Sequence, residues 1–122
     1  MIGISGRETN YIFGRQRHLD GFMPAIFHRT AELTNDPALR EMTYDVLRGC
    51  SEFWLRMLFR DESTQALMIR STLDLDEKTM GVSVLSAVIA CHWTLSVFAR
   101  EARRRKTDLP LAGRCENSLA EL

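Results

Sequence analysis

The feature that most constrains the fold is a stretch of twenty residues, from Met80 to Ala99, that contains no Asp, Glu, Lys or Arg. Its sequence is MGVSVLSAVIACHWTLSVFA. A helix that is uncharged all round must be covered by other groups over most of its circumference. The length also matches the hydrocarbon core of a bilayer. This segment must therefore either span a membrane or be surrounded by protein.

Small and polar residues in the segment favour burial in protein. Ser83, Ser86, His92, Thr94 and Ser96 interrupt its apolar residues, whereas insertion into a bilayer is driven mainly by Leu, Ile, Phe and Val. A membrane span is the alternative, because a basic cluster follows the segment as it follows the cytoplasmic end of many spans. We expect a soluble protein in which this helix is buried.

The uncharged segment is predicted to be the middle of a long helix over residues 75–106. Acidic residues precede it and basic residues end it, and both complement the helix macrodipole. The other helices of so short a chain are too few to cover it, so we expect a second copy to complete the shell. The predicted dimer interface is its stripe of small residues, namely Ser83, Ala87, Ala90, Cys91 and Thr94. The alternative is a bundle in which one chain covers the helix by itself.

Apolar residues at helical spacing predict further helices. One begins at Leu19, with an apolar side that runs to Leu33. The sequence Asn-Asp-Pro at 35–37 marks the start of a long helix over 37–60, because Asp can cap a helix and Pro suits its first position. A short helix is expected over 64–72, and no run alternates for long enough to predict a sheet. Phe53 and Trp54 are predicted to anchor the packing of helix 37–60 against helix 75–106.

These elements predict an all-α fold, a small bundle of three to four helices that is completed by dimerisation. The 122 residues suit a single domain. We expect a flexible arm at 1–18, the helical domain at 19–107, and a C-terminal tail at 108–122 with at most a short helical turn.

Charge and cysteine content indicate a neutral intracellular protein. Sixteen basic residues balance sixteen acidic ones, so no overall field favours nucleic acid or an anionic membrane. Cys50, Cys91 and Cys115 form neither a close pair nor a regular framework, which favours reduced thiols and the cytoplasm. We expect Cys50 and Cys91 in the core, Cys115 reactive in the tail, and no secretory signal at the N-terminus.

The sequence contains no pattern typical of catalysis or metal binding. The nucleophile-elbow, phosphate-loop, dinucleotide and metalloprotease motifs are absent. The three histidines are scattered, and paired carboxylates fall at predicted helix starts, where capping explains them. We therefore expect a protein that is not an enzyme and has neither cofactor nor metal.

The residues that the fold does not require predict a protein-binding function. Aromatic residues and Arg are enriched at interfaces, and they gather in the arm and at the end of helix 75–106. The predicted partner-binding residues are Tyr11, Phe13, Arg15, Arg17, Arg100, Arg103 and Arg104. We expect a small bacterial regulator or adaptor, such as an anti-activator, inhibitor or chaperone, that binds itself and a partner protein. The alternative is a DNA-binding transcriptional regulator that uses the basic cluster from Arg100 to Lys106.

Overall fold

The computed structural model of the chain describes residues 19–70, 72–73 and 80–122. These residues form four helices and two small two-stranded sheets, so the protein is mostly helical, as predicted. The expected arm at 1–18 and the acidic residues expected to cap the helix at 75 lie outside the described residues. In chain order the elements are α2 (Leu19–Thr34), α3 (Pro37–Met57), β1 (Leu58–Arg60), β2 (Leu67–Ile69), β3 (Thr72–Leu73), β4 (Met80–Gly81), α4 (Leu85–Arg105) and α5 (Leu109–Glu121).

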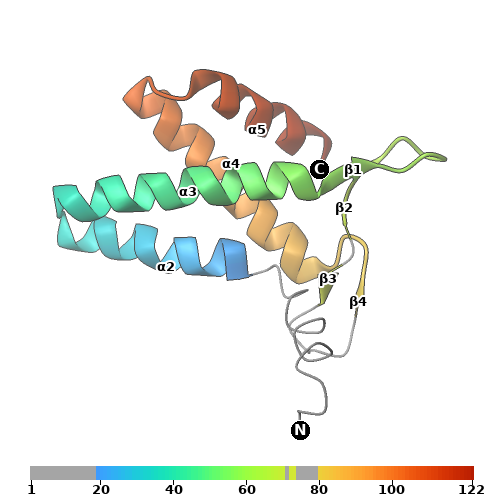
Figure 1. Cartoon of the computed structure of the whole chain (residues 1–122), viewed down its shortest axis with the longest axis horizontal. Helices are drawn as coiled ribbons and strands as arrows, with labels where there is room; N and C mark the ends of the chain where they lie inside the picture. The colour runs from blue at the N-terminus through green and yellow to red at the C-terminus, as the bar shows by residue number, and fades with distance from the viewer. Residues whose placement is uncertain (1–18, 71, 74–79) are drawn as a thin grey trace, which may run out of the picture.

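The helices pack in two layers, one formed by α2 and α3 and the other by α4 and α5. Figure 1 shows α2 and α3 side by side, with α4 crossing behind them and α5 packed against α4. The centre of the core is formed by Trp54 of α3 and Phe98 of α4, both fully buried. The prediction that Trp54 belongs to the core is confirmed. Its neighbour Phe53 is half-buried, and the two ring centroids lie 5.3 Å apart.

The turn between α2 and α3 forms as predicted. The carboxylate of Asp36 accepts hydrogen bonds from the backbone N–H groups of Ala38 (2.9 Å) and Leu39 (3.3 Å). Pro37 follows at the first helical position, where its missing N–H costs nothing. The helix ends at Met57, slightly before the expected boundary, because the chain there enters strand β1.

The prediction of a short helix over 64–72 is wrong, because residues 67–69 form strand β2 of a β-hairpin. Strands β1 and β2 pair antiparallel, with Leu58 opposite Ile69. Asp61 organises the turn instead of starting a helix, since its Oδ2 accepts hydrogen bonds from Ser63 and Thr64. These bonds, led by that from the Ser63 hydroxyl, lower the pKa of Asp61 to about 2.

The long helix begins at Leu85, ten residues later than the predicted start. Residues 80–81 pair with β3, and Ser83 is tied to β2 rather than to a helix. The Ser83 hydroxyl accepts a hydrogen bond from the N–H of Ile69 (2.9 Å), and the Ser83 N–H donates to the Ile69 carbonyl (3.0 Å). Residues 80–84 therefore belong to a strand and a loop, not to a further turn of helix.

The segment expected to be a tail is the fourth helix. Residues 109–121 form α5, which packs on α4 and buries Ala112 and Cys115 completely. The expectation that Cys115 is an accessible reactive thiol is therefore wrong. Burial raises the pKa of Cys115 to about 11.

Candidate protein-binding surface

The close approach of a helix to the small side chains of α4 comes from the same chain. Ala87, Ala90, Cys91 and Thr94 are all buried. Gly21 of α2 lies directly on Ala90, since a Cβ built at Gly21 would be 2.7 Å from the Ala90 Cα and 2.8 Å from its carbonyl oxygen. A second copy that used the predicted interface would first have to displace α2. The intramolecular alternative thus accounts for this stripe.

One side of α4 is nevertheless exposed, contrary to the expectation of a helix buried all round. Leu85 is 69% exposed and Ile89 is 50% exposed. His92 is also exposed on this side, where its Nδ1 lies 3.5 Å from the Ser96 hydroxyl. A groove runs between this side and α2, lined by Ala25, His28, Arg29, Glu32, Val88, Ile89, His92, Trp93, Ser96, Val97 and Arg100.

Six of the ten exposed large apolar side chains among the described residues lie on α2 and α3. We call them the apolar face, which comprises Met23, Ile26, Phe27 and Leu33 of α2 with Met42 and Val46 of α3. Their exposure ranges from 37% at Val46 to 71% at Leu33. By the helical period Met23, Ile26 and Leu33 lie away from the buried Pro24 and Ala31 of α2, whereas Phe27, three residues from Pro24 and four from Ala31, lies at the edge of the buried side. Figure 1 shows no other described helix over the side of the α2–α3 layer that faces away from α4.

The apolar face is large for a protein of this size. With about 180 Å² for a fully exposed large apolar residue, its six side chains expose on the order of 600 Å², at the upper end of the patches on ordinary monomers. The sequence predicts an apolar side on this helix, which includes Met23, Ile26, Phe27 and Leu33, but it does not show whether that side is covered. Too few other elements lie over α2 to bury them.

The basic cluster is largely neutralised within the chain. Arg103 forms two hydrogen bonds with Glu116, at 3.0 and 2.6 Å. Arg104 pairs in the same way with Glu101, at 3.2 and 2.6 Å. These bonds raise the pKa of both guanidinium groups and lower that of Glu116.

Of the two remaining arginines of the cluster, one has a carboxylate partner and the other has none among the described residues. Arg105 contacts Glu41 at 2.7 Å. Among the described residues only Arg100 of the predicted partner-binding arginines has no carboxylate partner, and it lies at the end of the α2–α4 groove. Lys106 also has no carboxylate partner among the described residues, so two of the five cations available for DNA phosphates, Arg100 and Lys106, are unpaired. The other predicted partner-binding residues, Tyr11, Phe13, Arg15 and Arg17, lie outside the described residues.

Comparison with known proteins and searches for metal sites and membrane spans add no further site among the described residues. No protein-family model, curated protein or solved structure matches this chain. Among the described residues, no three His, Cys, Asp or Glu side chains gather as metal ligands. No described helix has the combination of length and hydropathy that crossing a membrane requires.

Proposed function

We propose that this chain is a small helical regulator or adaptor that acts by binding another protein chain through the apolar face. The observation that supports the proposal is the concentration of six exposed large apolar side chains on α2 and α3. Exposed apolar patches of this extent are typical of protein interaction sites. None of the six side chains is titratable or nucleophilic, so the face offers a contact surface rather than catalytic groups. Such a surface fits a regulator or adaptor.

The occupant that we propose for the apolar face is a second copy of the chain. Two faces of on the order of 600 Å² would together bury about 1,200 Å², the lower end of a specific interface. Helices α2 and α3 run antiparallel (Figure 1), so a two-fold axis that lies in the interface, parallel to the layer, would bring each helix of one copy onto a helix of the other. Such a contact completes a four-helix arrangement in which Ile26, Phe27 and Met42 are covered.

Site-specific photo-crosslinking tests this proposal in cells. A photo-reactive phenylalanine analogue would replace Phe27, which lies on the apolar face and is 39% exposed. The matched control is the same analogue at Leu109, which is 41% exposed but belongs to α5. We expect position 27 to crosslink to a second copy and position 109 not to do so.

The products separate the two parts of the proposal. A crosslink from position 27 to a different protein would support protein binding by the apolar face but contradict the homodimer. Equal crosslinking at positions 27 and 109, or none at 27, would contradict the assignment of the binding function to this face.

A further inference from the structure

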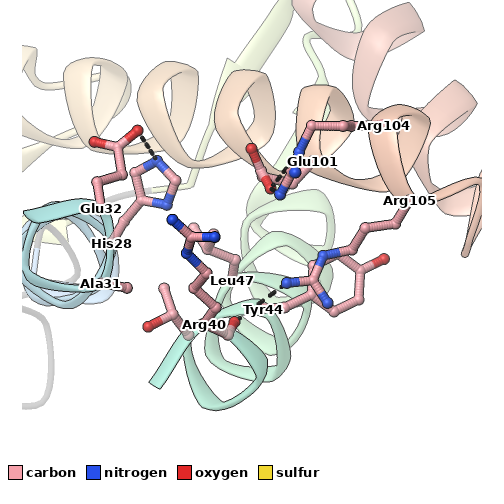
Figure 2. A pocket seen from close by; sticks show the side chains of 10 residues that line it. His28, Ala31, Glu32, Arg40, Tyr44, Leu47, Glu101, Arg104 and Arg105 are labelled. Atoms are coloured by element: carbon pink, nitrogen blue, oxygen red, sulfur yellow. Dashed lines mark hydrogen bonds and ion pairs between the residues drawn. The ribbon is translucent and has the colours of Figure 1, made fainter. Parts of the chain in front are cut away.

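A polar cavity separate from the apolar face lies where α2, α3 and the C-terminal end of α4 meet. Its volume is about 250 Å³. Figure 2 shows titratable side chains from all three helices around it: His28 and Glu32 from α2, Arg40 from α3, and Glu101, Arg104 and Arg105 from α4. Thr43, Tyr44 and Leu47 of α3 complete the wall with Ala31.

Three buried polar atoms in this wall have no hydrogen-bond partner within the described chain. They are the Thr43 hydroxyl oxygen, the Arg105 Nε and the His28 Nε2. Thr43 is only 3% exposed. His28 Nε2 lies 3.4 Å from a Glu32 carboxylate oxygen but without the geometry of a hydrogen bond. Buried polar groups are nearly always satisfied, and a ligand in the cavity would supply these atoms with partners.

The charges of the wall leave a positive excess. Glu101 is held by Arg104. Glu32 is shared between Arg29 (3.5 Å) and His28. Both carboxylates are therefore matched by cations of their own helices.

The other two arginines of the wall, Arg105 and Arg40, differ in whether a carboxylate balances their charge. Arg105 stacks 4.3 Å above the Tyr44 ring and contacts Glu41 and the Arg40 carbonyl. Among the described residues the Arg40 guanidinium donates a hydrogen bond only to the side-chain oxygen of Asn35, which is neutral. Its guanidinium therefore brings a positive charge to the cavity that no carboxylate balances, as seen beside His28 in Figure 2.

We propose that this cavity binds a small organic oxyanion, a molecule of metabolite size that carries a carboxylate or phosphate group. The Arg40 guanidinium supplies the charge and a planar pair of N–H donors, which suits either group. The Thr43 hydroxyl and the Arg105 Nε–H supply further donors from the buried side of the wall. The volume admits a small molecule but neither a peptide nor a nucleic acid strand.

Calorimetric titrations with inorganic phosphate and with succinate test the proposal at constant ionic strength. The full chain would be compared with Arg40→Gln, which removes the unbalanced charge, and Thr43→Val, which removes the buried hydroxyl at nearly constant shape. The control is Arg56→Gln, which changes another exposed arginine of α3 that does not line the cavity. Thermal melts would establish that every variant is folded.

We expect saturable binding of at least one of the two anions to the unchanged protein. Arg40→Gln should weaken it at least about tenfold, since a charge-assisted pair is lost, while Arg56→Gln should leave it unchanged. Binding of phosphate alone would assign a phosphorylated ligand, and binding of succinate alone would assign a carboxylate. Saturation by neither anion would overturn the proposal, as would equal weakening by Arg40→Gln and Arg56→Gln.

Discussion

Two glycines of neighbouring helices should respond in opposite directions to the same substitution. Gly21 of α2 lies against α4, where an added methyl group would be 2.7 Å from the Cα of Ala90 and 2.8 Å from its carbonyl oxygen. These are backbone atoms, so no side chain can rotate away. Gly49 of α3 has no atom within 4 Å of the position of an added methyl group. Gly21→Ala and Gly49→Ala therefore form a matched pair.

The expected magnitudes follow from packing and helix propensity. Forcing a methyl group into a closed contact costs about 1–3 kcal/mol or more. Alanine gains up to about 1 kcal/mol over glycine within a helix, and less at Gly21 because it is near the start of α2. We expect Gly21→Ala to lower the free energy of unfolding by about 1–2 kcal/mol. Gly49→Ala should raise it by about 0.5–1 kcal/mol.

Urea unfolding followed by circular dichroism would measure both changes. The comparison tests whether α2 of the same chain covers α4, because only that contact makes Gly21 obligatory. If Gly21→Ala is as stable as the unchanged protein, α2 does not pack on Ala90 and the intramolecular bundle is wrong. A loss of stability in Gly49→Ala would show that the outer side of α3 is covered in the folded protein.

Three further predictions concern the core and its titratable groups. Trp54→Ala should cost about 3–5 kcal/mol, because it empties a fully buried aromatic site, and a thermal midpoint unchanged from that of the native protein would contradict this placement. Burial raises the pKa of Cys91 to about 12 and that of Cys115 to about 11. A thiol reagent should therefore label only the half-buried Cys50 rapidly in the native state and all three cysteines in denaturant; rapid native labelling of two or more would refute this. Burial, followed by the hydrogen bond to Asp108, raises the pKa of Tyr44 from 10.0 to about 12. The protonated tyrosine is favoured in the folded state, so stability should be complete below pH 10 and fall as the pH rises towards 12. Tyr44→Phe should reduce this alkaline loss in a pH series of unfolding curves, at the cost of one hydrogen bond, about 0.5–1.5 kcal/mol.

Helices with local signals were predictable from the sequence. Asp36 and Pro37 specify the start of α3 by capping chemistry that acts within four residues. The apolar spacing around Trp54 likewise identified a buried side, because the period of a helix fixes which residues share a side.

Elements whose conformation depends on distant partners were not predictable. Leu67, Met68 and Ile69 form a strand because they pair with residues 58–60, a tertiary contact that overrides the apolar pattern of a short helix. Residues 109–121 contain Pro110 and Gly113, which suggest a tail. The fully buried Ala112 and Cys115 show that packing against α4 stabilises a helix there.

The two candidate sites also depend on tertiary contacts that the sequence does not reveal. The apolar face was visible as apolar residues of α2, but the sequence does not reveal how many neighbours cover a helix. The polar cavity joins Arg40 of α3 to Arg104 and Arg105 of α4, residues more than sixty positions apart. No local pattern connects them, and the sequence indicated only that the α4 arginines gather at a helix end.

Sedimentation equilibrium tests the central claim, that the apolar face binds a second copy, most directly. The unchanged protein would be compared with Leu33→Glu, which adds a charge to the most exposed side chain of the face, and with Leu109→Glu as a control on α5. We predict that the unchanged protein and the Leu109→Glu variant approach twice the 14.0 kDa mass of the chain with rising concentration. The Leu33→Glu variant should stay at the mass of one chain. A monomeric unchanged protein at every concentration, or dimers of equal strength in all three proteins, would contradict the account.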